Sequence, residues 1–245
     1  KDFFEKAIEI NPNYVGALNN LGVIFQRLGE NQKAKECYEK TIEINPDQAG
    51  AHNNLGNIFN ELGKKQKAKD CFEKAIEINP NHAITHNNLG NMFQKLGEKQ
   101  KAKDCFEKAI EINPNYVNAH NNLGSIFKSL GENQKAKDCF KKAIEINPNH
   151  VNAHNNLGII FQSLGEIEKA KECYEKSIEI NPNYANAHYN LGIIFQKLGE
   201  NEKAKDCYEK AIEINPNLTD AINNLGNIFQ ELGEYQKAKY YFEKA

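Results

Sequence analysis

The stretch VNAHNNLGSIFKSLGENQKAKDCFKKAIEINPNH, residues 117–150, decides the fold, because close variants of it fill the chain of 245 residues. Its proline recurs at a fixed interval of 34 residues, at Pro12, Pro46, Pro80, Pro114, Pro148, Pro182 and Pro216. A strict period of this length indicates an array of one repeated unit, in which each unit contacts mainly its neighbours.

Each unit is predicted to be a hairpin of two helices. The first helix has an apolar face at helical spacing, made by Ala119, Leu123, Ile126, Phe127 and Leu130. The second helix has an apolar side made by Ala136, Cys139, Phe140, Ala143, Ile144 and Ile146. Pro148 ends the second helix, because the residue before proline avoids the helical conformation. Asn149 is then expected to cap the next first helix.

Two glycines recur in every unit. One lies inside the predicted first helix, as Gly124 does, where glycine costs about 1 kcal/mol relative to alanine. Its presence in every unit predicts that another helix crosses too closely for a side chain. The other, Gly131 in the quoted stretch, follows the first helix and is expected to adopt the left-handed conformation that ends it.

This set of Leu-Gly, Phe, Ala, aromatic, Ala and Pro resembles the tetratricopeptide repeat. The resemblance implies an all-α fold, an α-solenoid in which helix hairpins stack into a right-handed superhelix. With Val15 as position 1, the repeats are 15–48, 49–82, 83–116, 117–150, 151–184 and 185–218, followed by a truncated repeat at 219–245. Residues 1–14 are the tail of an earlier repeat. The usual aromatic at position 17 is present only as Tyr235, which predicts a looser hairpin turn elsewhere.

Both ends of the chain lie inside predicted second helices. We therefore expect the chain to be part of a longer protein, with apolar surface at Phe3 and Phe4 and at Tyr240, Tyr241 and Phe242. Solenoids usually need a polar capping unit at each end. End-to-end association of the chain is the resulting prediction.

The resemblance places positions 2, 5, 6, 9, 12 and 13 on a concave wall, which is rich in amide side chains. Position 6 is asparagine in every repeat, and position 9 is asparagine in three; together these are Asn20, Asn54, Asn88, Asn122, Asn156, Asn190 and Asn224, with Asn57, Asn91 and Asn227. An amide offers a donor and an acceptor, as a peptide backbone does. These residues are the predicted peptide-binding site. Alternatively, the position-6 asparagines support hydrogen bonds between helices or form a solvated face.

The repeats are most similar to the superhelix of O-linked N-acetylglucosamine transferase-type proteins, through AHNNLG at 51–56, 119–124 and 153–158. That resemblance implies an asparagine ladder that contacts a substrate backbone. The Lys and Arg clamp by which other tetratricopeptide domains hold a chaperone carboxylate is absent: position 5 is Asn or Tyr, and position 6 is never Arg.

Recurrent cysteines and histidines are interpreted as structural. The cysteines occupy position 23 of successive units, too far apart for disulfides, and no CxxC spacing indicates zinc. Reduced thiols favour a reducing, cytoplasmic location. Histidines at position 4 are expected to pack between paired helices; His82 with His86, and His150 with His154, have metal-binding spacing but no companion carboxylate. No cofactor, metal site or catalytic residue is predicted.

The charge balance excludes several partner classes. The formal net charge is −2, which gives no general attraction to nucleic acid or to an anionic membrane, and no apolar run is long enough to span a bilayer. The lysines are expected on a solvated convex face, with Glu36–Lys40 and Asp70–Lys74 as ion pairs.

The predicted function is therefore a non-enzymatic scaffold that binds other proteins or extended peptides. Two alternatives stay open. In one, the chain is the substrate-recognition arm of a larger enzyme such as an O-GlcNAc-type glycosyltransferase. In the other, it is a structural solenoid that assembles end to end.

Overall fold

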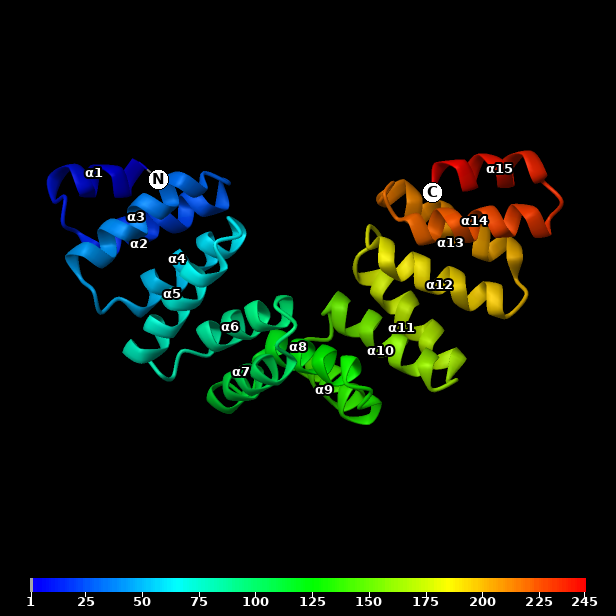
Figure 1. Cartoon of the computed structure of the whole chain (residues 1–245), viewed down its shortest axis with the longest axis horizontal. Helices are drawn as coiled ribbons and strands as arrows, with labels where there is room; N and C mark the ends of the chain where they lie inside the picture. The colour runs from blue at the N-terminus through cyan, green and yellow to red at the C-terminus, as the bar shows by residue number, and fades with distance from the viewer. Residues whose placement is uncertain (1) are drawn as a thin grey trace. The chain divides into compact units, whose positions relative to one another are not determined.

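The computed structural model describes residues 2–245, which form fifteen α-helices and no strand (Figure 1). The helices are α1 (Asp2–Ile10), α2 (Val15–Arg27), α3 (Asn31–Ile44), α4 (Ala49–Glu61), α5 (Lys65–Ile78), α6 (Ala83–Lys95), α7 (Lys99–Ile112), α8 (Val117–Ser129), α9 (Asn133–Ile146), α10 (Val151–Ser163), α11 (Ile167–Ile180), α12 (Ala185–Lys197), α13 (Asn201–Ile214), α14 (Thr219–Glu231) and α15 (Tyr235–Lys244). The predicted all-α solenoid is confirmed.

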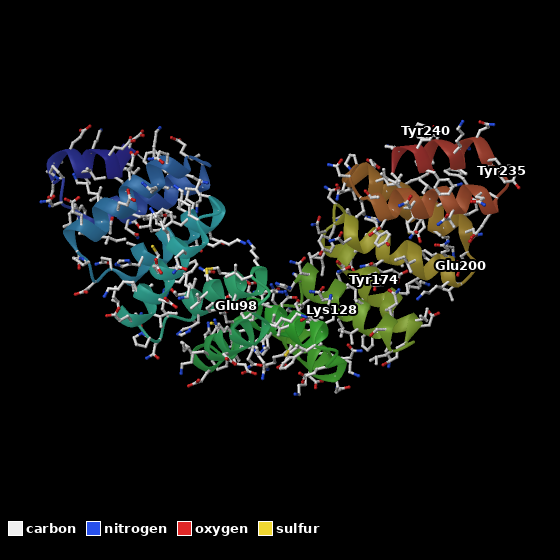
Figure 2. The ribbon with its side chains drawn as sticks, in the orientation of Figure 1. Glu98, Lys128, Tyr174, Glu200, Tyr235 and Tyr240 are labelled. Carbon is white, nitrogen blue, oxygen red and sulfur yellow. The ribbon has the colours of Figure 1, made fainter. Side chains whose placement is uncertain are left out.

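The chain divides into two compact units. Unit 1 extends to Ile126 and unit 2 runs from Phe127 to Ala245, so the division falls within α8. In both units the helices pair as hairpins, for example α4 with α5 and α12 with α13. The second helix of each hairpin also contacts the first helix of the next, as α5 contacts α6 and α13 contacts α14. In unit 2, the loops that join the hairpin helices lie along one side, where Glu200 and Tyr235 are labelled (Figure 2).

The core repeats with the sequence. Taking the repeat at 83–116, Leu89, Met92 and Phe93 of α6 are buried together with Ala102 and Phe106 of α7. Phe106 and its counterparts at position 24 of the other complete repeats are the largest fully buried side chains. Because the complete repeats bury the same positions, the apolar stripe continues from one helix hairpin to the next within unit 1 and within unit 2.

The helical glycine makes room for this buried ring. A Cβ placed on Gly90 would lie 2.6 Å from Cε1 of Phe106, well inside van der Waals contact. The predicted close approach is thus confirmed, and its cause is the aromatic side chain of the paired second helix. Gly97 ends α6 with φ of +78°, which confirms the predicted left-handed turn.

Two local predictions were wrong. Leu130, expected on the apolar face, is 44% exposed, because it follows the last residue of α8 at the hairpin turn. Asn149 does not cap α10: its backbone N–H donates to Oδ1 of Asn147 at 3.0 Å. His150 caps the helix instead, with its side chain accepting from the backbone N–H of Ala153 at 3.1 Å.

The expected ion pairs of the second helices also differ. Asp70 accepts from Nε2 of Gln66 at 2.7 Å, and Lys74 pairs with Glu77 at 3.0 Å. Glu36 likewise accepts from Nε2 of Gln32 at 2.8 Å. The acids and lysines lie on exposed helix surface as expected. However, Asp70 and Glu36 each bond to a glutamine four residues earlier in the same helix, and not to the predicted lysine. Among the described helices none is long and apolar enough to cross a membrane.

Candidate functional site

The position-6 asparagines connect successive first helices. In unit 1, Nδ2 of Asn88 donates to Oδ1 of Asn53 at 3.0 Å, and Nδ2 of Asn122 donates to Oδ1 of Asn87 at 3.0 Å. In unit 2, Nδ2 of Asn190 donates to Oδ1 of Asn155 at 2.9 Å. These bonds, from position 6 of one repeat to position 5 of the repeat before it, are called the amide ladder below.

The acceptors of the amide ladder are buried and the donors are half-buried. Asn53, Asn87 and Asn155 are 5%, 4% and 4% exposed. A buried amide needs a partner, because an unpaired one costs about 1–3 kcal/mol. The structure therefore uses the Nδ2 groups of these three ladder donors inside the protein. Of these three donors, Asn88 also lines a recess between the first helices α4 and α6.

The remaining position-6 asparagines are placed less uniformly. Asn20 is exposed, while Asn54 and Asn156 are half-buried. Oδ1 of Asn54 accepts from Nδ2 of Asn53 at 3.2 Å. Asn224 follows the repeat that has a tyrosine at position 5, so its Nδ2 lies 3.5 Å from the hydroxyl of Tyr208 instead.

A recess lies beside the amide ladder in unit 1. Its volume is about 520 Å³, and its lining comes from α4 and α6: Asn57, Asn60, Asn88, Asn91, Gln94 and Lys95. We call it the unit-1 recess. Three of its residues, at positions 6 and 9, were predicted from the sequence. Asn91 accepts from Nδ2 of Asn122 at 3.0 Å, so the ladder fixes one side of the recess.

A tyrosine at position 24 bonds the glutamine at position 12 in both units. In unit 1 the hydroxyl of Tyr38 donates to Oε1 of Gln26 at 3.2 Å. In unit 2 the hydroxyl of Tyr174 donates to Oε1 of Gln162 at 2.8 Å, and that of Tyr208 donates to Oε1 of Gln196 at 2.9 Å. Burial raises the pKa of these two unit-2 phenols, so they remain donors.

In the two repeats that form the unit-1 recess, the aromatic residues at position 24 are Phe72 and Phe106, which have no hydroxyl. Asn60 and Gln94 therefore line the recess without that bond. The pairing of Tyr at position 24 with Gln at position 12 was visible in the sequence and was missed.

Unit 2 has a recess of its own at its last repeat. It measures about 390 Å³ and is lined by Gln196, Asn227, Gln230, Glu231 and Tyr235; we call it the unit-2 recess. Asn227, predicted at position 9, is exposed there. Earlier in unit 2, position 9 is apolar, with Ile159 and Ile193 half-buried. Tyr189, at position 5, is also half-buried, and its ring lies 6.0 Å from that of Tyr208.

The histidines at position 4, which were predicted to pack between paired helices, make a recurrent hydrogen bond to the turn before their own helix. Each bonds through Nε2 to the carbonyl oxygen of the preceding proline; the distances for His52, His86, His120, His154 and His188 are 2.9, 3.0, 2.9, 2.8 and 2.9 Å. The histidine thus fastens the first helix to the turn that enters it.

The histidine pairs are also engaged in hydrogen bonds. Nδ1 of His82 lies 2.5 Å from the hydroxyl of Thr85, and Nδ1 of His150 accepts at the N-terminus of α10. Burial lowers the pKa of both rings. Among residues 2–245 no group of three metal-ligating side chains comes together.

The six cysteines are half-buried free thiols. Burial raises the pKa of Cys71, Cys105 and Cys207 to about 11, so these thiols are protonated at neutral pH. A protonated thiol is a poor nucleophile and a poor metal ligand. We therefore interpret the six cysteines as structural residues that pack between helices.

Comparison with known proteins identifies the repeat. The model of the tetratricopeptide repeat matches residues 15–48, 49–82, 83–116, 117–150 and 185–218. A second model, described as TPR repeat, matches residues 160–199, and a third, described as tetratricopeptide repeat, matches residues 139–172 and 207–240.

Individual relatives cover different shares of their own length. The uncharacterized protein ycf37 of Pyropia yezoensis is 51% identical over 35 residues, which are 14% of this chain and 20% of that protein. The structure of the APC/C hetero-tetramer Cut9-Hcn1 matches 92% of this chain and 45% of its own, with a TM-score of 0.84 and 16% identity. YrrB, described as a TPR protein with an unusual peptide-binding site, matches 77% of this chain and 97% of its own, with a TM-score of 0.59 and 26% identity.

Proposed function

Because this chain belongs to the tetratricopeptide repeat family, we propose that it is a non-catalytic scaffold that binds an extended segment of a partner protein along its first helices. The observation that carries the proposal is the unit-1 recess, where five amide side chains and one lysine converge without an acid. The similarity to YrrB, which is described as having a peptide-binding site, supports the same class of ligand.

The chemistry of the recess suits a peptide backbone. An extended peptide presents an N–H donor and a C=O acceptor at each residue, and a side-chain amide can satisfy both. Asn57, Asn60 and Gln94 are not held by a tyrosine hydroxyl, so their amides are available for such bonds. The amide ladder supports the recess by fixing α4 and α6 relative to each other through Asn88 and Asn53.

The proposed site therefore consists of the residues predicted at positions 6 and 9, and the two positions have different roles. The position-9 amides, Asn57 and Asn91 in unit 1 and Asn227 in unit 2, contact the ligand directly. The position-6 amides hold neighbouring helices with Nδ2 and present the rest of the group to the ligand. The half-buried thiols fit a reducing, cytoplasmic location, which we include in the proposal.

A triple variant tests the proposal. Asn57→Ala, Asn60→Ala and Gln94→Ala together remove the amides not bonded to tyrosine and leave the amide ladder intact. We expect binding of proteins captured from a lysate of the source cells, or of peptides selected from a random library, to fall by about tenfold or more. The control is Gln66→Ala, Gln100→Ala and Gln134→Ala on the exposed second helices. Equal binding by both variants would contradict the proposed site.

The amide ladder also favours a second candidate, in which the array selects substrates for a catalytic domain elsewhere in the protein. The AHNNLG stretches supply the ladder residues Asn53, Asn122 and Asn155. They are also the stretches on which the predicted resemblance to O-GlcNAc-type transferases rests. A glycosyltransferase assay on the full-length protein, with peptides that bind this chain as acceptors, distinguishes the arm of an enzyme from a free scaffold.

End-to-end self-assembly is the third candidate, and it rests on exposed apolar side chains. Phe3 is 88% exposed on α1, while Tyr240 and Phe242 are 57% and 42% exposed on α15. Tyr240 points away from α14 in Figure 2. Light scattering over a concentration series is the test: a constant monomer mass would remove this candidate and leave the binding proposal unaffected.

A further inference from the structure

The unit-1 recess carries a single charge, and it is positive. Lys95 lies exposed at the end of α6, and no acid lines the recess. No ion pair within residues 2–245 engages Lys95. Glu61, at the same position of the preceding repeat, accepts from Nδ2 of Asn31 at 3.0 Å and is not among the residues that line the recess. A ligand in the recess therefore meets one cation and no carboxylate among the lining residues.

The amides add hydrogen-bond donors around this cation. Within the described chain no hydrogen bond occupies the amides of Asn57, Asn60 or Gln94. Asn91 uses its Oδ1 to accept from Asn122, which leaves its Nδ2 hydrogens for a ligand. A carboxylate is an acceptor only, with about four lone-pair sites, and it forms stronger hydrogen bonds than a neutral group does.

The unit-2 recess provides a contrast within the same chain. It too is formed by first helices and lined by amides, but position 13 there is Glu231. That carboxylate accepts from Nδ2 of Asn201 at 3.0 Å, as Glu61 does from Asn31. Position 13 thus sets the sign of the charge in these two recesses, which is positive in the unit-1 recess and negative in the unit-2 recess.

Resting on the proposed function, we infer that the unit-1 recess accepts the side-chain carboxylate of an aspartate or glutamate carried by the bound segment. Lys95 is its counter-ion, and the amides of Asn57, Asn91 and Gln94 donate to it. A lysine or arginine of the ligand is repelled here. A nucleic acid is disfavoured, because affinity for phosphate backbones comes from many cationic contacts and this site has one.

The experiment uses the whole chain and a displayed library of random dodecapeptides. Peptides selected on the wild-type chain are aligned, and the dissociation constant of the best binder is measured by fluorescence anisotropy. It is compared with that of the same peptide in which Asp or Glu is replaced by Asn or Gln. Both peptides are then measured on Lys95→Gln, on Lys95→Glu and on Lys65→Gln. Lys65 is exposed at the first residue of α5 and serves as the control for net charge.

We expect an acidic residue at one fixed place in the selected peptides. Its neutral replacement should weaken binding to the wild-type chain about threefold to tenfold, with no such difference on Lys95→Gln. Lys95→Glu should bind the neutral peptide better than the acidic one, and Lys65→Gln should match the wild type.

Three results would overturn the inference. Selected peptides without an acidic preference, or with affinities indifferent to Lys95, would refute carboxylate recognition while the peptide-binding proposal survives. Displacement of the acidic peptide by single-stranded RNA at equal concentration would show a phosphate site instead. Failure to select any peptide would refute the proposed function and this inference together.

Discussion

The first-helix surfaces of the two units differ at the same repeat positions. In unit 1, position 9 is Asn57 and Asn91 in adjacent repeats, and the paired aromatic residues are phenylalanines. In two adjacent repeats of unit 2, position 9 is Ile159 and Ile193, and the paired aromatics are tyrosines that bond the position-12 glutamines. One backbone design thus presents unbonded amides in two repeats of unit 1, and apolar side chains with bonded amides in two repeats of unit 2.

The difference separates the residues that hold neighbouring helices together from the residues that line the recesses on the first helices. The residues shared by all repeats, such as the position-6 asparagines and the helical glycines, hold helices together in both units. Most residues that line the recesses, such as Asn57, Lys95 and Glu231, are at positions that change from repeat to repeat, although Asn88 is at the shared position 6. A ligand that distinguishes the two units must therefore read the changing positions.

The largest expected effect concerns the ring that the helical glycine accommodates. Gly90→Ala should destabilise the chain by about 1–3 kcal/mol, because the new Cβ lies 2.6 Å from the Phe106 ring. Gly192→Ala should cost more, since displacing the Tyr208 ring also breaks its bond to Gln196. Urea unfolding followed by circular dichroism measures both.

Gly50→Ala is the control for that pair, because no atom lies within 4 Å of its added Cβ. It should raise stability by up to about 1 kcal/mol, through the better helix propensity of alanine. If Gly90→Ala were as benign as Gly50→Ala, the ring could not be the reason for the glycine.

An exchange of aromatic residues should convert one surface toward the other. Phe106→Tyr places a hydroxyl near Gln94, so we expect a gain of about 0.5–1.5 kcal/mol in stability and weaker peptide binding at the unit-1 recess. Tyr208→Phe should lose a similar amount by releasing Gln196. Denaturant unfolding and anisotropy titration give the two quantities. Unchanged peptide binding by the Phe106→Tyr variant would show that Gln94 does not contact the ligand.

The smallest expected effect is a pH dependence in unit 2. Burial lowers the pKa of His150 below its ordinary value of 6.5, and its Nδ1 must stay unprotonated to accept from Ala153. Between the two pKa values the unfolded chain binds the proton and the folded chain does not. Stability is therefore complete above pH 6.5 and falls as the pH drops below it. Melting temperatures at pH 7.5 and 5.5 should differ less for His150→Asn, which keeps an acceptor that does not titrate.

Several features of the fold could be predicted from the sequence because they repeat. The 34-residue period, the helix hairpins and the left-handed glycine turns all follow from spacing that every repeat shares. The predictions were wrong at the ends of helices, where the spacing does not decide which of two neighbouring residues caps the helix or is the last to be buried. His150 replaced Asn149 as the helix cap, and Leu130 lay just beyond the last turn that its spacing suggested.

The candidate site divides in the same way. The sequence by itself determined that a wall of amides runs along the first helices, since spacing alone puts positions 6 and 9 on one helix face. Only the tertiary structure decided which amides bond to each other, as Asn88 does to Asn53, and which make no hydrogen bond within residues 2–245, as is the case for Asn57. The physical reason is that a hydrogen bond joins two atoms at about 3 Å, and that distance depends on how one helix packs against the next.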